Sequence, residues 1–359
     1  MNQRINLVLK EMADRGIDHL IISDPSSIEY LIDYRNQPGE RMYVLLLTLD
    51  GNHTLFLNNL FYLDHELDLN VVWYSDTDDY ISLLSTYLSE ANCIGVDKFW
   101  SAKFLLPLMS LTNDEACFEL GSICVDYIRM KKDEQEQAIM KEASRLNDLA
   151  IDQVIALCAK GHLSEREVTK RVAGIHQSLG CTGNSFAPII AYGKNGADNH
   201  HDGDDTLLKP GDSIVIDMGG LYKGYCSDMT RTVFYKEVSE EQARVYNLVR
   251  QANEAAEAMI KPGVRLCDID KTAREIIAQG GFVAEFNHRL GHFIGRDVHE
   301  YGDVSANFDM EVEEGMIFSI EPGVYIQGDF GVRIEDLVLV TKDGCEVLNS
   351  YTKDLLVIG

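Results

Sequence analysis

The sequence predicts two domains: an α/β domain over residues 1–128 and an α+β domain with an internal duplication over residues 129–359. Three observations indicate this architecture. Helical and strand-like segments alternate through the first part of the chain, and a sharply polar stretch at residues 129–136 marks a boundary. In the second part, a set of helix signals recurs after roughly one hundred residues. The length of 359 residues accommodates two domains of ordinary size.

In the first domain, apolar residues at helical spacing predict an amphipathic helix over residues 5–17, and a short buried strand follows at residues 20–22. Two apolar runs, residues 43–48 and 53–57, flank an Asp-Gly pair and predict a β-hairpin. This domain shows no obvious cluster of catalytic residue types, so we expect the chemistry in the second domain.

The second domain repeats one arrangement of helices. Each half is expected to contain a long helix that ends at a glycine, followed by a second helix. The signals are a helical face over residues 139–157 with Gly161, capping boxes at Ser164/Glu167 and Ser239/Gln242, a second terminal glycine at Gly263, and a helical pattern over residues 267–279. They predict a degenerate duplication with pseudo-twofold symmetry.

The composition narrows the class of protein. A net charge of −26 argues against a nucleic-acid partner, because binding phosphates requires a basic face. No apolar stretch is long enough for a membrane span, and the N-terminal segment lacks a signal-peptide pattern, so a cytoplasmic location is expected. The eight cysteines include no Cys-x-x-Cys pair, which favours reduced thiols over a disulfide framework or a zinc ribbon.

Carboxylates occur where apolar strands are predicted. Asp217 ends a β-branched run, and Asp228 lies in the strand that follows. A turn at Tyr222 and Lys223 would place the two acids directly opposite each other, with Cβ atoms about 5 Å apart.

The pattern repeats downstream, where a loop centred on Gly328 would place Glu321 opposite Glu335. Like charges that face each other destabilise a hairpin, and burying them without partners costs several kcal/mol or forces protonation. Divalent cations between the acids would remove both problems.

His292 lies between the two hairpins in the sequence and adds an imidazole. Four carboxylates and one histidine suit two cations such as Mn²⁺, Co²⁺ or Zn²⁺, bridged by carboxylates. Each residue alone has an ordinary alternative, because a strand-end aspartate usually forms a turn and a lone histidine usually makes a structural hydrogen bond. The combination of two acid pairs and a histidine predicts a dinuclear metal site.

The motifs that contain these residues resemble those of the pita-bread metallopeptidases, in particular the prolidase and aminopeptidase P branch. The matching segments occur in the family's order and are residues 217–220, 227–232, 291–300, 321–323 and 333–336. The resemblance implies a pita-bread fold for the second domain and a creatinase-like fold for the first. It also implies hydrolysis of the peptide bond before proline, and a homodimer.

Residue roles follow from the same resemblance. The metal ligands would be Asp217, Asp228, His292, Glu321 and Glu335, with Glu321 also serving as the proton shuttle. The other matching positions are the catalytic, substrate-contacting histidines His200 and His299 and the substrate-side residues Tyr325 and Arg333. Residues 38–41 resemble a loop that reaches the active site of the partner subunit, which makes Arg41 a candidate substrate-binding residue.

Two departures from the family pattern bear on the substrate. Asn199 stands where the family generally has proline, and Asp303 stands where prolidases commonly carry an arginine that can hold a dipeptide's terminal carboxylate. Chain length and the Arg41 loop favour an Xaa-Pro dipeptidase, whereas Asp303 favours an aminopeptidase P that acts on longer peptides.

More distant alternatives fit less well. A methionine aminopeptidase usually lacks so large an N-terminal domain, and creatinase lacks the metal site. A non-catalytic peptide-binding relative would have lost ligands that are intact in this chain.

Overall fold

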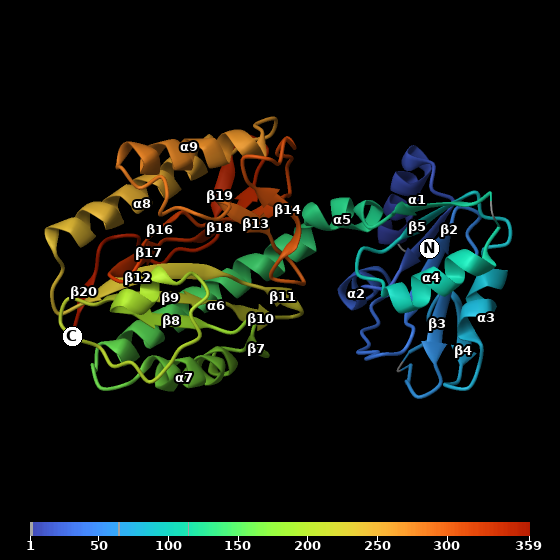
Figure 1. Cartoon of the computed structure of the whole chain (residues 1–359), viewed down its shortest axis with the longest axis horizontal. Coiled ribbons are helices and arrows are strands. Elements are labelled where there is room, and N and C mark those ends of the chain that lie inside the picture. Colours follow the sequence, from blue (N-terminus) through green and yellow to red (C-terminus); the bar gives the residue numbers. More distant parts are fainter. Residues whose placement is uncertain (1–2, 64, 114) are drawn as a thin grey trace. The chain divides into compact units, whose positions relative to one another are not determined.

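The computed structural model describes residues 3–63, 65–113 and 115–359. The chain divides into two compact units, Met1–Arg129 and Met130–Gly359 (Figure 1). Each unit has hydrophobic cores of its own, so each is described by itself.

The first unit is built on a six-stranded sheet in the order β4-β3-β2-β1-β5-β6. The predicted hairpin is confirmed, because β2 and β3 pair antiparallel, as do β1 and β2, while the other neighbours pair parallel. The elements are α1 (Gln3–Arg15), β1 (His19–Ile22), α2 (Pro25–Ile32), β2 (Val44–Thr48), β3 (Thr54–Asn58), β4 (Asn70–Tyr74), α3 (Tyr80–Thr86), β5 (Cys93–Val96), α4 (Ala102–Leu111), β6 (Cys117–Leu120) and α5 (Ile123–Met130).

The second unit combines two helix pairs with antiparallel sheets. Its first half contains α6 (Glu134–Cys158), α7 (Glu165–Ser178), β7 (Gly183–Asn184), β8 (Ile189–Tyr192), the 3-10 helix η1 (Gly193–Ala197), β9 (Ser213–Met218), β10 (Gly220–Tyr222), β11 (Tyr225–Cys226) and β12 (Met229–Tyr235). Its second half contains α8 (Glu240–Met259), α9 (Leu266–Gln279), β13 (Gly291–Phe293), β14 (Glu300–Val304), β15 (Ile317–Ile320), β16 (Gly323–Ile326), β17 (Phe330–Arg333), β18 (Asp336–Val340), β19 (Cys345–Val347) and β20 (Val357–Ile358).

The predicted α+β architecture is confirmed. The larger sheets have the orders β20-β12-β9-β8 and β14-β13-β15-β18-β19, and the pairs α6–α7 and α8–α9 lie on opposite sides of them (Figure 1). Both predicted capping boxes are present, at Ser164 and Ser239. Gly161 and Gly263 have φ angles of +70° and +87°, a conformation that favours glycine, and they follow the long helices of the two halves, three residues after Cys158 and four residues after Met259.

The first acidic hairpin differs from the predicted register. Asp217 pairs with Thr230 rather than with Asp228, because the turn residues are Lys223 and Gly224. Both have positive φ, 49° and 77°, as a type I′ turn requires, and glycine meets that requirement without strain. Moving the turn by one residue moves the partner of Asp217 by two. Asp228 therefore lies just before β12, diagonal to Asp217.

The second acidic hairpin has the predicted register. Two strand pairs share it, with Ile320 opposite Asp336 in β15–β18 and Gly323 opposite Arg333 in β16–β17. Glu321 and Glu335 lie in the break between these pairs, where the same register sets them opposite each other. The break releases both residues from the ladder at the point where the chain passes from one sheet to another.

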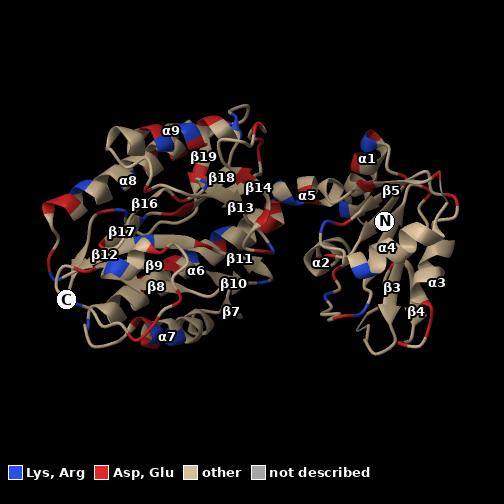
Figure 2. Ribbon diagram, viewed as in Figure 1, with Lys and Arg blue, Asp and Glu red and all other residues tan. Residues whose placement is uncertain are grey.

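Charged residues of both signs are interspersed along α7, α8 and α9 (Figure 2). This distribution is typical of solvated helix faces. None of the described helices combines the length and the apolarity needed to cross a membrane.

Candidate active site

A cavity of about 890 Å³ in the second unit brings together the predicted site residues of that unit. Its lining includes residues from both halves of the duplication: Asp217, Asp228, His292, Glu321, Glu335, His200, His299, Tyr325 and Arg333. Arg41 lies in the first unit, where its guanidinium forms a two-point ion pair with Asp76 at 2.9 and 2.8 Å.

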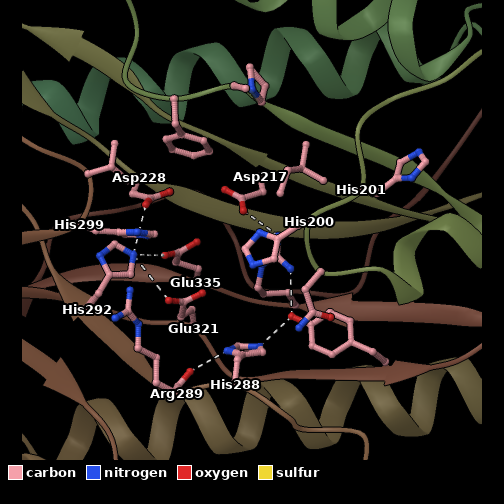
Figure 3. A pocket seen from close by; sticks show the side chains of 18 of the residues that line it. His200, His201, Asp217, Asp228, His288, Arg289, His292, His299, Glu321 and Glu335 are labelled. Atoms are coloured by element: carbon pink, nitrogen blue, oxygen red, sulfur yellow. Dashed lines mark hydrogen bonds and ion pairs between the residues drawn. The ribbon is translucent and has the colours of Figure 1, made fainter. Parts of the chain in front are cut away.

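Three acids converge on His292 (Figure 3). Its Nε2 lies 3.6 Å from Asp228 Oδ2, 3.6 Å from Glu321 Oε1 and 3.9 Å from Glu335 Oε1. Nδ1 lies 3.2 Å from the carbonyl oxygen of Phe293, so Nδ1 carries the proton and Nε2 presents its lone pair to the acids. A lone pair that faces carboxylate oxygens is repelled unless a proton or a metal cation lies between them.

The acids also keep unpaired oxygens in the interior. Asp217 Oδ1, Asp228 Oδ1 and Glu335 Oε1 are buried and have no hydrogen-bond partner among the described residues. Buried polar atoms are almost always satisfied, so three exceptions in one cavity require an explanation. A bound cation would satisfy all of them.

Asp228, Glu321, Glu335 and His292 form a buried cluster, and burial and neighbouring charges shift their pKa values. Burial raises the pKa of Asp228 and of Glu335 well above the ordinary range, and the neighbouring carboxylates add to both shifts. Burial also raises the pKa of Glu321 to about 7 and lowers the pKa of His292 to about 3. Without cations, some acids of the cluster therefore retain protons at neutral pH, while His292 is uncharged.

Backbone and side-chain contacts aim Glu335 at the cluster. Thr230 Oγ1 donates to Glu335 Oε2 at 2.7 Å, and the Glu335 N–H donates to the Thr230 carbonyl at 3.0 Å. Arg231 Nη1 donates to the Glu335 carbonyl oxygen at 2.7 Å. These bonds hold Oε2 and the main chain, which leaves Oε1 facing His292.

A hydrogen-bonded chain runs from Asp217 to a histidine that sequence reasoning missed. Arg333 donates from Nη2 to Asp217 Oδ2 at 2.7 Å and from Nη1 to the Tyr325 hydroxyl at 3.0 Å. Since that hydroxyl already accepts a bond, it donates to His288 Nε2 at 3.0 Å, and His288 Nδ1 donates to the Arg289 carbonyl at 2.7 Å. A signal for His288 exists, because in an extended segment it shares a face with His292, four residues later.

His200 lies on a loop that is fastened to a buried carboxylate on α7. Glu165 is fully buried, and four polar groups from both sides of His200 contact it: the Tyr192 N–H at 2.7 Å, Asn195 Nδ2 at 3.0 Å, His201 Nε2 at 2.7 Å and the Asp204 N–H at 3.0 Å. In Figure 3, His200 lies toward the acids and His201 points away from them. Glu165 and His201 therefore fix the loop, and His200 faces the cavity.

His299 lies directly beside the cluster, with its ring centroid 4.2 Å from that of His292. Burial lowers the pKa of His299, so its ring is neutral at pH 7 and one ring nitrogen carries a proton that it can donate.

The residues present fit a divalent cation. Ligand atoms of Asp228, His292 and Glu335 lie within 4.8 Å of one another, and all three residues are buried. Carboxylate oxygens with one neutral imidazole are donors that divalent metals accept, and a cation would offset the repulsion that raises the acids' pKa values.

The chain is similar to known proteins in both sequence and fold. The pattern of metallopeptidase family M24 matches residues 138–342, and that of the creatinase/prolidase N-terminal domain matches residues 4–131. An uncharacterized peptidase of Staphylococcus aureus is 34% identical over 357 residues, which are 98% of this chain and 99% of the relative.

Two solved structures are similar over almost their whole length. The prolidase from Pyrococcus horikoshii is 30% identical, with a TM-score of 0.87 over 99% of this chain and 100% of the other. The X-Pro aminopeptidase from Thermotoga maritima is 28% identical, with a TM-score of 0.81 over 96% of this chain and 99% of the other. The cluster of buried acids therefore stands in a fold that known metallopeptidases share. This chain belongs to metallopeptidase family M24, carries a creatinase/prolidase N-terminal domain, and is a metal-dependent peptidase.

Proposed function

We propose that this peptidase binds two divalent cations and cleaves the peptide bond before proline, as an Xaa-Pro dipeptidase. The observation that carries the proposal is the set of three buried, unpartnered carboxylate oxygens beside the neutral imidazole of His292. The prolidase and X-Pro aminopeptidase named above support the choice of proline peptides.

The five ligands would divide between two cations. Asp217 and Asp228 would hold one, while Asp228 and Glu335 would bridge to the second, which His292 and Glu321 complete. Mn²⁺ or Co²⁺ is the expected metal, and the donor set also accommodates Zn²⁺. When bound, the cations would lower the pKa of a shared water and polarise the scissile carbonyl.

The other residues would manage protons and charge. Glu321 would take the proton of the attacking water and deliver it to the prolyl nitrogen as the peptide bond breaks. His200 and His299 would donate N–H groups to the oxygen that becomes negative when the carbonyl is attacked. Arg333 holds Asp217, Tyr325 accepts a hydrogen bond from Arg333, and both residues would border the substrate.

Kinetics with Xaa-Pro and Xaa-Pro-Yaa peptides test the substrate assignment. The wild-type protein, supplied with Mn²⁺ or Co²⁺, is expected to have the higher kcat/KM on the dipeptide. Faster release of the first residue from the tripeptide would instead establish an aminopeptidase P, the alternative that Asp303 favours. Absence of turnover on both peptides would refute the proposed function.

Metal uptake is expected to release protons. In the metal-free site, the pKa of Glu321 is raised to about 7, and those of Asp228 and Glu335 are raised well above normal. Cations must displace these protons, so affinity should fall as the pH is lowered below about 7. Calorimetry in two buffers with different ionisation enthalpies measures the release, and identical heats in both would contradict it.

The raised pKa values also predict how the stability of the metal-free protein depends on pH. A carboxyl group whose pKa is higher in the folded state stabilises the fold at low pH, and this contribution is lost as the pH rises. For Glu321 the window lies between 4.5 and about 7 in the metal-free protein.

We also propose a cytoplasmic homodimer in which Arg41 of the partner subunit reaches the substrate. The support is the resemblance of residues 38–41 to the prolidase loop. Light scattering that gives the mass of a single chain would contradict the dimer.

A further inference from the structure

Two arginines, Arg289 and Arg333, are in the described lining of the cavity, and Arg289 is the one with guanidinium nitrogens that have no partner among the described residues. The other, Arg333, is buried, and its three nitrogens bond to Asp217, Tyr325 and Thr230. The Arg289 side chain is 33% exposed, and among the described residues its guanidinium pairs only with Asp303, through Nη1. Nε and Nη2 of Arg289 therefore remain available to a ligand.

Backbone hydrogen bonds fix the position of the Arg289 main chain. Its carbonyl accepts a hydrogen bond from His288, and the next residue, Leu290, donates its N–H to the Val304 carbonyl at 2.9 Å. The Leu290 carbonyl accepts from the Glu321 N–H at 2.7 Å. Arg289 is thus attached through the backbone to the segment that carries a predicted metal ligand.

Asp303 holds the guanidinium from outside the cavity. It lies on β14, where it pairs with His292 of β13, and it is not among the cavity-lining residues, whereas Arg289 is. In Figure 3 the Arg289 side chain points toward Glu321 and His292. After burial, the charge of Arg289 is the next largest cause of the lowered pKa of His299, which agrees with a guanidinium near the catalytic residues.

We propose that Arg289 binds the free C-terminal carboxylate of a short peptide substrate, and that Asp303 positions the guanidinium for this contact. The inference rests on the proposed function, because in an Xaa-Pro dipeptide the proline carries that carboxylate. An anion so close to the scissile bond enters a cavity whose described lining already contains five carboxylates. It therefore needs a cation with free donors, and guanidinium offers charge-assisted hydrogen bonds of suitable geometry.

The test compares substrates that differ only in this carboxylate. We would measure kcat/KM for an Xaa-Pro dipeptide and for the same dipeptide as its C-terminal amide, with wild type, Arg289→Met and Arg289→Lys. The ratio of the two values is the readout, because any general damage to folding or metal binding affects both substrates alike. Arg250→Met is the matched control, since Arg250 is 34% exposed, pairs with Glu254 and Asp354, and does not line the cavity.

Wild type is expected to prefer the free acid, and Arg289→Met should reduce that preference by about 10- to 100-fold, the range for a hydrogen bond to a charged group. Arg289→Lys should keep part of the preference, and Arg250→Met all of it. An unchanged ratio in Arg289→Met, or a wild type that cleaves acid and amide equally well, would overturn this inference while the proposed function stands. Failure of wild type on both substrates would instead count against the proposed function.

Discussion

Replacing Asp228 by asparagine is expected to abolish peptidase activity and, at the same time, to stabilise the metal-free protein. Asp228 is the proposed bridge between both cations. Its loss should remove several kcal/mol of transition-state stabilisation and so lower the rate by about 10³-fold or more. In the metal-free state, the substitution removes a buried acid whose pKa is raised by burial and by Glu335, Asp217 and Glu321. Its removal should therefore raise the free energy of unfolding by on the order of 1 kcal/mol.

These opposite effects separate a metal ligand from an ordinary core residue. Denaturant unfolding with and without added Mn²⁺, together with metal analysis, measures them. Asp268→Asn is a suitable control, because Asp268 forms an exposed pair with Arg265 and should change stability by less than about 1 kcal/mol. Near-normal turnover in Asp228→Asn, or metal content equal to that of wild type, would refute the bridging role.

His299→Ala is expected to retain its metal and to lose rate. A donor to a developing oxyanion contributes about 10²- to 10³-fold in kcat. His299 is neutral and stacks edge-on against His292, so it is placed to donate without being a ligand. Steady-state kinetics and metal analysis on the same sample measure both quantities. His162→Ala, at an exposed histidine, is the control and should match wild type.

The outcome for His299 distinguishes two roles. Loss of metal from the variant would mean that His299 supports the ligand set rather than the substrate. Unchanged kcat would remove His299 from the mechanism altogether.

Much of the architecture could be predicted from the chain because local signals repeat. Two capping boxes and two left-handed glycines mark equivalent helices, and the acids interrupt apolar strands where solvated residues would not be expected. The register of the second hairpin followed correctly from a loop centred on Gly328.

The errors and omissions have physical causes. The first hairpin was misregistered because the turn is decided by which residues accept positive φ, and Lys223–Gly224 meets that condition better than Tyr222–Lys223. His288 and Arg289 were missed because neither belongs to a pattern of paired acids. The spacing of His288 from His292 is a signal that one face holds both, but the contacts of His288 with Tyr325 and of Arg289 with Asp303 join residues distant in sequence, and periodicity does not reveal those contacts.

Glu165 illustrates the same limit. In the sequence it is simply the first residue of α7 after a capping serine. In the fold it accepts or shares four polar contacts that determine where His200 points. A residue that acts through a loop 27 to 39 positions away gives no local signal of its role.

Anomalous diffraction from crystals grown with Mn²⁺ would test the central claim most directly. We predict two peaks per chain, both within the cavity. The ligands of the two ions together should be Asp217, Asp228, His292, Glu321 and Glu335. An empty acid cluster in metal-bearing, active crystals, or ions bound only by residues elsewhere in the chain, would contradict the account.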